Sequence, residues 1–160
     1  MQRHPRSLPT RFAIAATALL LTAPAVAADF KVTTEAPSVL YDAPSAKARA
    51  LYVYGRDVPV EVLVGVEGWT KIRDVGGTIG WFGAKALADK RVLLVRVPIA
   101  EVRANPDEAA PLVFRAEQNV LLDLAENASS AATTATPGWV KVRHRDGQVG
   151  FVRVPQVFGL

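Results

Sequence analysis

The chain has 160 residues and no cysteine, so its stability must come from packing without disulfide bonds. Its 19 lysines and arginines exceed its 15 acidic residues, but three of those arginines lie within the first 11 residues, where no acid occurs. Without these three, 16 basic residues face 15 acidic ones and the net charge is near +1. No concentrated basic patch remains, so we expect no nucleic-acid partner.

The N-terminal segment has the pattern of a cleaved secretory signal peptide. A basic opening, an apolar run and small residues follow one another: Arg3, Arg6 and Arg11, then residues 12–21, then Ala25-Val26-Ala27. The apolar run of about ten residues is half the length that a membrane-spanning helix needs. A short membrane anchor is the alternative. We predict a signal peptide over residues 1–27 with cleavage near Ala27, and a periplasmic or secreted mature protein without a membrane span.

Two stretches of the mature chain match without a gap. Residues 68–82 read GWTKIRDVGGTIGWF and residues 138–152 read GWVKVRHRDGQVGFV. They share Gly-Trp, a lysine, an arginine and two later glycines at matching places. Such a repeat predicts two copies of one small unit, which we place over residues 28–90 and 91–160.

The first copy alternates apolar and polar residues with a period of two, which is typical of strands. Residues 58–64 are rich in β-branched side chains, and residues 69–73 alternate. Gly76-Gly77 predicts a hairpin turn before a returning strand over 78–82, because glycine readily adopts positive φ. Residues 84–87 predict a short helical turn that closes the copy.

The second copy repeats this order. Strands are expected over 119–124, 139–143 and 148–152, with a hairpin at Asp146-Gly147 and a closing turn over 155–157. Residues 91–97 (RVLLVRV) predict an extra apolar strand that bridges the copies. The insertion ENASSAATTATP over 126–137 predicts a polar surface loop.

These motifs resemble the bacterial SH3-like (SH3b) domains, and in particular the exported subgroup with two such domains in tandem. The resemblance rests on G-W-x-K-[IV]-R, G-x-x-G-[WF], the matching elements at residues 40–44 and 102–106, and the tail over 157–160. It implies an all-β fold of two tandem small β-barrels that act as recognition modules, associated with cell-wall peptides, peptidoglycan or envelope proteins. Arg103 occupies a position where related domains usually carry arginine, whereas the first copy has Tyr41.

No residue pattern indicates catalysis, a metal site or a cofactor. His144 is the single histidine after the predicted leader, and no nucleophile or orienting acid accompanies it in the sequence. We interpret His144 as a solvated strand residue. The chain is therefore expected to be a non-enzyme without cofactors.

The aromatic residues are the better candidates for binding, since aromatic faces stack against sugars and extended peptides. We predict ligand-binding roles for Tyr41, Tyr52, Tyr54, Trp69 and Trp139. Tyr52 and Tyr54 flank Val53, so we expect both on one partly exposed face. Trp81 and Phe151 are expected in the cores. The first copy, which carries most of these residues, is the expected binding half.

Two functions of different class remain open. The first is an exported binding module that recognises a peptidoglycan peptide or an envelope protein segment through an aromatic groove. The second is a periplasmic scaffold or accessory subunit that docks a protein partner through its barrel surfaces, with an apolar patch or an exposed strand edge at residues 91–97.

Overall fold

The computed structural model describes residues 28–34, 37–125 and 137–160. The signal peptide predicted over 1–27 lies outside the described residues, and so does the predicted loop over 126–137 apart from Pro137. Among the described residues, no helix is both long and apolar enough to span a bilayer.

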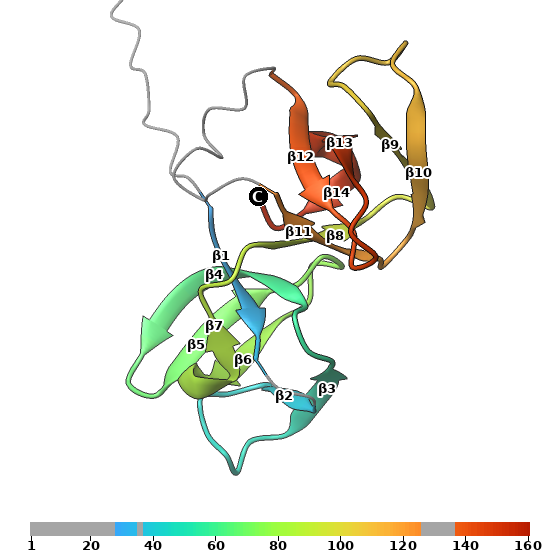
Figure 1. Ribbon diagram of the computed structural model, residues 1–160. Helices are drawn as coiled ribbons and strands as arrows, with labels where there is room; N and C mark the ends of the chain where they lie inside the picture. Colours follow the sequence, from blue (N-terminus) through green and yellow to red (C-terminus); the bar gives the residue numbers. More distant parts are fainter. Residues whose placement is uncertain (1–27, 35–36, 126–136) are drawn as a thin grey trace, which may run out of the picture.

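The first half of the chain forms one antiparallel sheet, which we call unit 1 (Figure 1). Its strands are β1 (Asp29–Thr33), β2 (Ser38–Tyr41), β3 (Ala50–Tyr54), β4 (Pro59–Val66), β5 (Trp69–Arg73), β6 (Ile79–Gly83) and β7 (Leu87–Ala88). They lie in the order β3-β2-β6-β5-β4-β1-β7. The last strand therefore returns to pair with the first.

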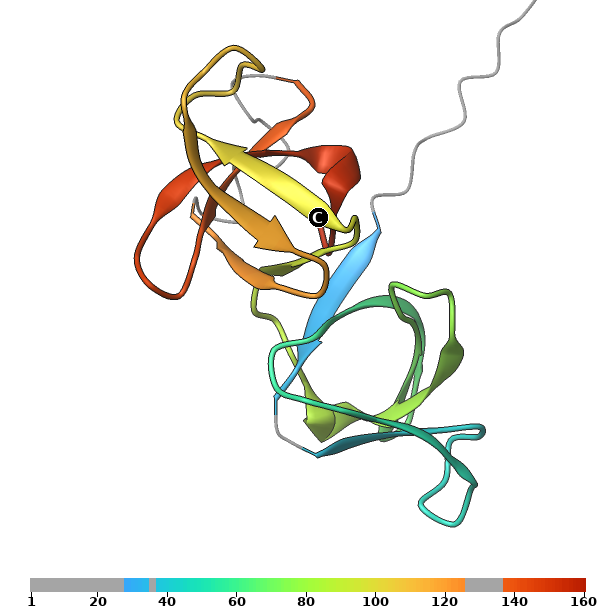
Figure 2. The same ribbon diagram turned by 90° about the vertical axis from the view of Figure 1, so that its right-hand side faces the viewer.

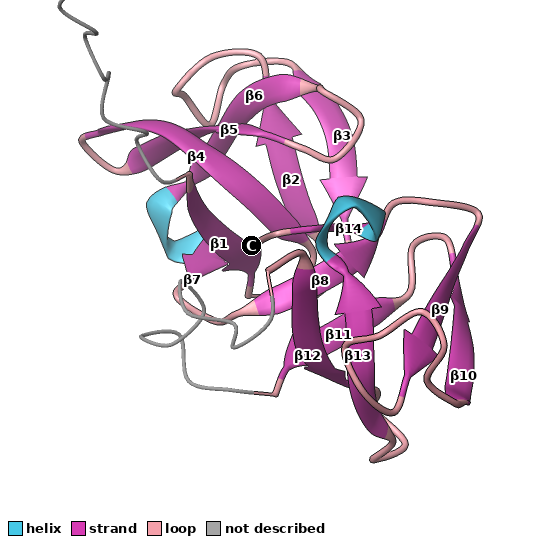
Figure 3. Ribbon diagram, turned by 90° about the horizontal axis from the view of Figure 1, so that it is seen from above, coloured by secondary structure: helices cyan, strands magenta, loops and turns pink. Residues whose placement is uncertain are grey.

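The second half forms another sheet, unit 2. Its strands are β8 (Val92–Val95), β9 (Ile99–Arg103), β10 (Leu112–Glu117), β11 (Leu121–Leu124), β12 (Trp139–Arg143), β13 (Val149–Arg153) and β14 (Val157–Phe158). Their order, β10-β9-β13-β12-β11-β8-β14, is that of unit 1 with each strand seven places later. The prediction of an all-β fold with one motif present twice is confirmed, and each sheet curls around its own interior (Figure 3).

One sequence prediction needs correction. The strand expected over 91–97 does not bridge the copies and is not an exposed edge: β8 lies between β11 and β14, and all four of its residues are buried. It is the first strand of unit 2 and corresponds to β1. Sequence reasoning did not recognise β1 because its charged residues, Asp29 and Lys31, interrupt the apolar pattern that β8 shows.

Short 3₁₀ turns close both units, as predicted. These are η1 (Ala84–Ala86) and η3 (Val154–Gln156), each placed between the sixth strand and the short closing strand of its unit. The same hydrogen bond holds both turns, from Ala84 N to Gly68 O and from Val154 N to Gly138 O, each at 2.9 Å. The two repeats thus share this backbone hydrogen bond even though the donor residues differ.

Each unit has its own core, and the two cores differ in kind. The core of unit 1 contains Phe82 with Leu40, Val60 and Ile72, all fully buried, and Tyr54 packs against it. The core of unit 2 is aliphatic: Leu93, Val95, Ala100, Val102, Ala116, Leu122, Val140, Val142, Val152 and Val157. The buried core of unit 1 therefore includes an aromatic ring, Phe82, whereas the fully buried positions of the unit 2 core hold aliphatic side chains.

One glycine of each repeat permits close approach of two strands. A Cβ atom on Gly80 would lie 2.7 Å from Leu40 Cγ and 2.8 Å from Tyr41 O. A Cβ on Gly150 would lie 2.7 Å from Arg103 O. The glycine after the hairpin is thus required by the pairing of the sixth strand with the second in both units.

The units touch through their first and last strands. Figures 1 and 2 show two bodies one above the other, with the C-terminus at their junction. Phe30 of β1 meets Phe158 of β14 edge to face, with ring centroids 5.1 Å apart. Gly159 adopts a φ of 109°, and a Cβ there would lie 2.6 Å from Val92 O and 3.0 Å from Pro59 Cβ. The apolar tail of unit 2 therefore packs against unit 1.

Candidate functional site

Unit 1 carries an open aromatic groove on the outer side of its sheet. The rings of Tyr41 and Trp69 meet edge to face, with centroids 5.7 Å apart. Tyr41 ends β2 and Trp69 begins β5, so the sheet brings residues far apart in the sequence together. The groove, about 470 Å³ in volume, is lined by Pro37, Ser38, Val39, Tyr41, Trp69, Gly83, Lys85 and Ala86. This arrangement suits an extended chain that stacks on aromatic faces.

A further aromatic residue continues this outer face. Trp81 is the cross-strand partner of Tyr41, and the Lys71 ammonium lies 5.7 Å from its ring centroid. Trp81 is only partly buried and is not in the core, so the prediction for it was wrong, as was the same prediction for Phe151. The reason is the alternation of the strand: Phe82 points inward, so its neighbour points outward.

The structure separates the two tyrosines of β3 from the groove. Tyr52 is 58 % exposed and does not line it. Tyr54 packs edge to face on Phe82 and donates a hydrogen bond to Asp74 Oδ2 at 2.7 Å. Burial, together with that hydrogen bond, raises the pKa of the Tyr54 phenol. Of the predicted aromatic set in unit 1, Tyr41 and Trp69 come together, whereas Tyr54 is tied to the core.

Unit 2 has the equivalent groove with different chemistry. Trp139 lies where Trp69 lies, and Arg103 replaces Tyr41, since each pairs with the aromatic residue of the sixth strand. The groove, about 640 Å³ in volume, is lined by Ile99, Glu101, Arg103, Glu108, Arg115, Trp139, Arg153 and Gln156. Three arginines and two glutamates thus line this groove, whereas Lys85 is the one charged residue among the described residues that line the groove of unit 1.

These charges are engaged with one another. Glu101 pairs with Arg103 and Arg115, and Glu108 pairs with Arg153. Arg103 Nη1 also donates to Ala110 O at 2.8 Å. The Arg153 guanidinium covers the Trp139 ring at 5.2 Å, and Trp139 is only 6 % exposed. The predicted binding residue of unit 2 is therefore covered by its own neighbours.

One pair of residues that distinguishes the two grooves was missed by sequence reasoning, whereas the difference between Tyr41 and Arg103 was noted. Gly83 and Arg153 occupy equivalent positions, one residue beyond the ends of the two matching stretches. Extending the gapless alignment by one place would have found this difference.

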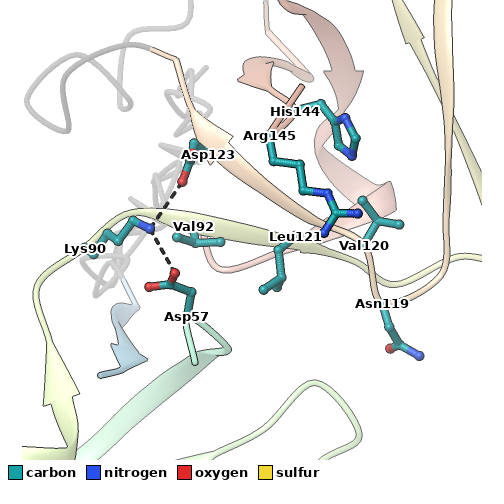
Figure 4. Close-up of a pocket in the computed structure, with 9 residues that line it drawn as sticks. All are labelled: Asp57, Lys90, Val92, Asn119, Val120, Leu121, Asp123, His144 and Arg145. Atoms are coloured by element: carbon teal, nitrogen blue, oxygen red, sulfur yellow. Dashed lines mark ion pairs between the residues drawn. The ribbon is translucent and has the colours of Figure 1, made fainter. Parts of the chain in front are cut away.

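A cavity of about 470 Å³ lies at the junction of the units (Figure 4). Lys90 Nζ lies 3.2 Å from Asp57 Oδ2 of unit 1 and 3.5 Å from Asp123 Oδ1 of unit 2. Figure 4 shows the Arg145 side chain between these ion pairs and His144. Because Lys90 and both carboxylates are partly exposed, each ion pair contributes little to stability. The positive charges of Lys90 and Arg145 balance the two carboxylates, and the ion pairs of Lys90 join the two units.

His144 is not the solvated strand residue that was expected. It follows β12 in the hairpin turn, and its side chain is 25 % exposed. Its ring lies 5.6 Å from that of Phe114, and Nδ1 lies 2.9 Å from Asp146 Oδ1. In the described parts of the chain, no three His, Cys, Asp or Glu side chains gather as metal ligands would.

Comparison with known proteins agrees with this architecture. Residues 34–89 match the family model described as "Bacterial SH3 domain". No curated protein matches the chain.

The solved structures to which the chain is similar include the following three proteins. NlpC1 from Trichomonas vaginalis is 16 % identical with a TM-score of 0.37, over 88 % of this chain and 50 % of that one. NlpC2 from the same organism is 15 % identical with a TM-score of 0.33, over 81 % and 46 %. An NlpC/P60 family protein from Bacillus cereus is 15 % identical with a TM-score of 0.36, over 81 % and 56 %. The chain thus spans about half the length of these proteins.

The matched residues contain strands β2 to β7, and therefore both β2 and β5, which carry Tyr41 and Trp69. The expected all-β fold of two SH3-like units is confirmed by the two sheets and by this match. Residues 34–89, which lie within unit 1, thus match the bacterial SH3 domain family.

Proposed function

We propose that this chain is an exported, non-catalytic binding protein of the cell envelope, and that the Tyr41–Trp69 groove of unit 1 recognises an extended peptide of the cell wall. The observation that carries the proposal is the edge-to-face pair of Tyr41 and Trp69 lining an open groove. Rigid aromatic side chains of this kind supply large contact area at low entropic cost. The N-terminal signal pattern supports export.

In this proposal the two units act as separate domains, over residues 28–90 and 91–160, with unequal roles. Unit 1 offers accessible rings. In unit 2 the corresponding Trp139 is covered by Arg153. Unit 1 therefore binds, and unit 2 supports it through the contact between Phe30 and Phe158.

The test is sedimentation with purified sacculi. The unmodified chain is expected in the pellet, whereas Tyr41→Ala and Trp69→Ala should each weaken binding by about tenfold or more, as loss of an interface anchor does. Tyr52→Ala is the matched control, since this tyrosine is exposed but lies outside the groove. Circular dichroism of each variant checks that it is folded. If the unmodified chain stays wholly in the supernatant, cell-wall recognition is rejected.

A docking function without a small-ligand site is the second candidate. It is favoured by Tyr52 and Val53, which are 58 % and 66 % exposed on β3, the edge strand of unit 1. Exposed apolar residues on an edge strand are suited to pairing with another chain. Under this alternative, crosslinking in envelope extracts repeatedly recovers one partner protein with the unmodified chain. Val53→Lys abolishes this crosslink, whereas Trp69→Ala retains it. The reverse result favours the groove.

A further inference from the structure

Tyr54 of unit 1 has a much smaller counterpart in unit 2, and this difference leaves room for a ligand beside the hairpin turn that follows β12. In unit 1 this position is Tyr54, opposite Ser38 in the β2–β3 pairing. Its hydroxyl donates to Asp74 Oδ2 at 2.7 Å, and its ring meets Phe82 at 5.5 Å. A phenol ring that belongs to the chain itself therefore fills this site in unit 1.

In unit 2 the same position is occupied by alanine. Ala116 pairs with Ala100 as Tyr54 pairs with Ser38, and Val152 stands where Phe82 stands. Both rings of the unit 1 arrangement are thus replaced by small or branched side chains. The backbone around the site is nevertheless the same. Gly77 N bonds Asp74 O at 3.0 Å, and Gly147 N bonds His144 O at 2.9 Å.

The replacement coincides with a pocket. It has a volume of about 260 Å³ and is lined by Phe114, Arg115, Ala116, Val120, His144, Asp146 and Gln148. An engineered cavity of about 150 Å³ already admits benzene in another protein, so this pocket accommodates a single substituted ring. Its walls combine an aromatic side chain, aliphatic groups and an imidazole, as ligand pockets usually do.

His144 stands at the position of Asp74 in the repeat, and it can offer an acceptor there in another way. Its Nδ1 lies 2.9 Å from Asp146 Oδ1. Because an ionised carboxylate only accepts hydrogen bonds, Nδ1 carries a hydrogen, and Nε2 of the neutral imidazole is then an acceptor. Asp74 accepts the Tyr54 hydroxyl in unit 1. An acceptor for a phenol hydroxyl is therefore present at the equivalent place in unit 2.

We propose that this pocket of unit 2 binds the phenol ring of a tyrosine side chain carried by a partner peptide. The ring packs against Phe114, Ala116 and Val120, and the hydroxyl donates to His144 Nε2. The site lies on unit 2 and does not depend on the Tyr41–Trp69 groove. Unit 2 would then have a binding role of its own, which its covered Trp139 does not supply.

The experiment is a titration of the ¹⁵N-labelled chain with N-acetyltyrosinamide, followed by NMR. We expect shifts at Ala116, Val120 and Gln148. N-acetylphenylalaninamide should bind about threefold to tenfold more weakly, because it lacks the hydroxyl that would donate to His144 Nε2. Equal affinity for the two probes would overturn phenol recognition, and shifts confined to the Tyr41–Trp69 groove would overturn the site.

Two variants complete the test. Ala116→Tyr supplies the ring that unit 1 carries, so it should fold and lose the binding of N-acetyltyrosinamide. His144→Phe should reduce the preference for the tyrosine probe and retain ring binding. Should Ala116→Tyr fail to fold, His144→Phe still decides the outcome. An unchanged preference in His144→Phe would contradict the proposal.

Discussion

The guanidinium of Arg153 lies 5.2 Å from the ring centroid of Trp139, and the equivalent residue beside Trp69 in unit 1 is Gly83. A single side chain thus covers the tryptophan ring in the groove of unit 2, whereas unit 1 has no side chain at the equivalent position. The cation–π contact is partly exposed at the arginine, so it contributes about 0.5–1 kcal/mol. Its larger effect is to remove Trp139 from solvent.

An arginine at position 83 should cover the Trp69 ring, and a glycine at position 153 should expose the Trp139 ring. Gly83→Arg is tolerated sterically, because no atom lies within 4 Å of a Cβ at this position. We expect it to block the Tyr41–Trp69 groove and to abolish sedimentation with sacculi, with little loss of stability. Gly65→Arg is the matched control, since its Cβ also meets open space and Gly65 does not line the groove. Undiminished binding by Gly83→Arg would refute the assignment of the site.

The reciprocal variant, Arg153→Gly, should expose the Trp139 ring. We expect tryptophan emission to move to longer wavelength and quenching by acrylamide to increase. Glu108→Gln removes the ion pair of Arg153 but leaves the arginine in place, so it should produce a smaller change. Identical spectra for Arg153→Gly and the unmodified chain would show that Arg153 does not cover the ring in solution.

Close strand approach makes Gly80 intolerant of even one added carbon. We expect Gly80→Ala to lower the free energy of unfolding by about 1–3 kcal/mol, because the added Cβ would press on Leu40 and on the carbonyl of Tyr41. Gly55→Ala, whose Cβ meets no atom within 4 Å, should change it by less than about 0.5 kcal/mol. Urea denaturation measures both. Equal effects of the two substitutions would contradict the proposed packing.

The hydrogen bond from the Tyr54 hydroxyl to Asp74 ties the end of β3 to the turn after β5 and so stabilises unit 1. Tyr54→Phe retains the ring contact with Phe82 but removes the hydroxyl, and should cost about 1–2 kcal/mol at pH 7. Tyr52→Phe is the control, because Tyr52 is largely exposed.

The pH dependence of this effect follows from the raised pKa of Tyr54. The folded state favours the protonated phenol, so the contribution is complete below the ordinary pKa of 10.0 and is lost as the pH rises through the folded value. The difference between Tyr54→Phe and the unmodified chain should therefore shrink only in strongly alkaline solution. A difference that vanishes by pH 8 would contradict this account.

Much of this fold can be predicted from particular residues. The hairpins at Gly76-Gly77 and Asp146-Gly147 and the alternation in residues 69–73 predict β5, β6, β12 and β13, because these signals are local. The role of β8 could not be predicted, since an apolar run of this length is consistent with several positions in a sheet. Trp81 was misplaced because a large aromatic residue suggests a core, whereas its position next to the inward-facing Phe82 decides its direction.

The candidate site could be predicted only in part, for a similar reason. Tyr41 and Trp69 were identified, but nothing local to Tyr54 showed that it would bond Asp74 across the sheet. Nor could composition reveal that Arg153 covers Trp139, because that contact depends on the register between β12 and β13. Comparison of the two copies position by position carries most of this missing information.

The contact between Phe30 and Phe158 should couple the unfolding of the two units. Each unit is small enough that its core alone gives marginal stability. Loss of one ring removes an edge-to-face pair worth about 0.5–1.5 kcal/mol beyond the buried area. We expect Phe158→Ala to broaden or split the single thermal unfolding transition, as the units begin to unfold separately. Calorimetry measures this, and Phe114→Ala, which removes a ring packed against the core of unit 2, should lower the transition temperature without splitting it. A single sharp transition in Phe158→Ala would show that the apolar tail over 157–160 is not what couples the units.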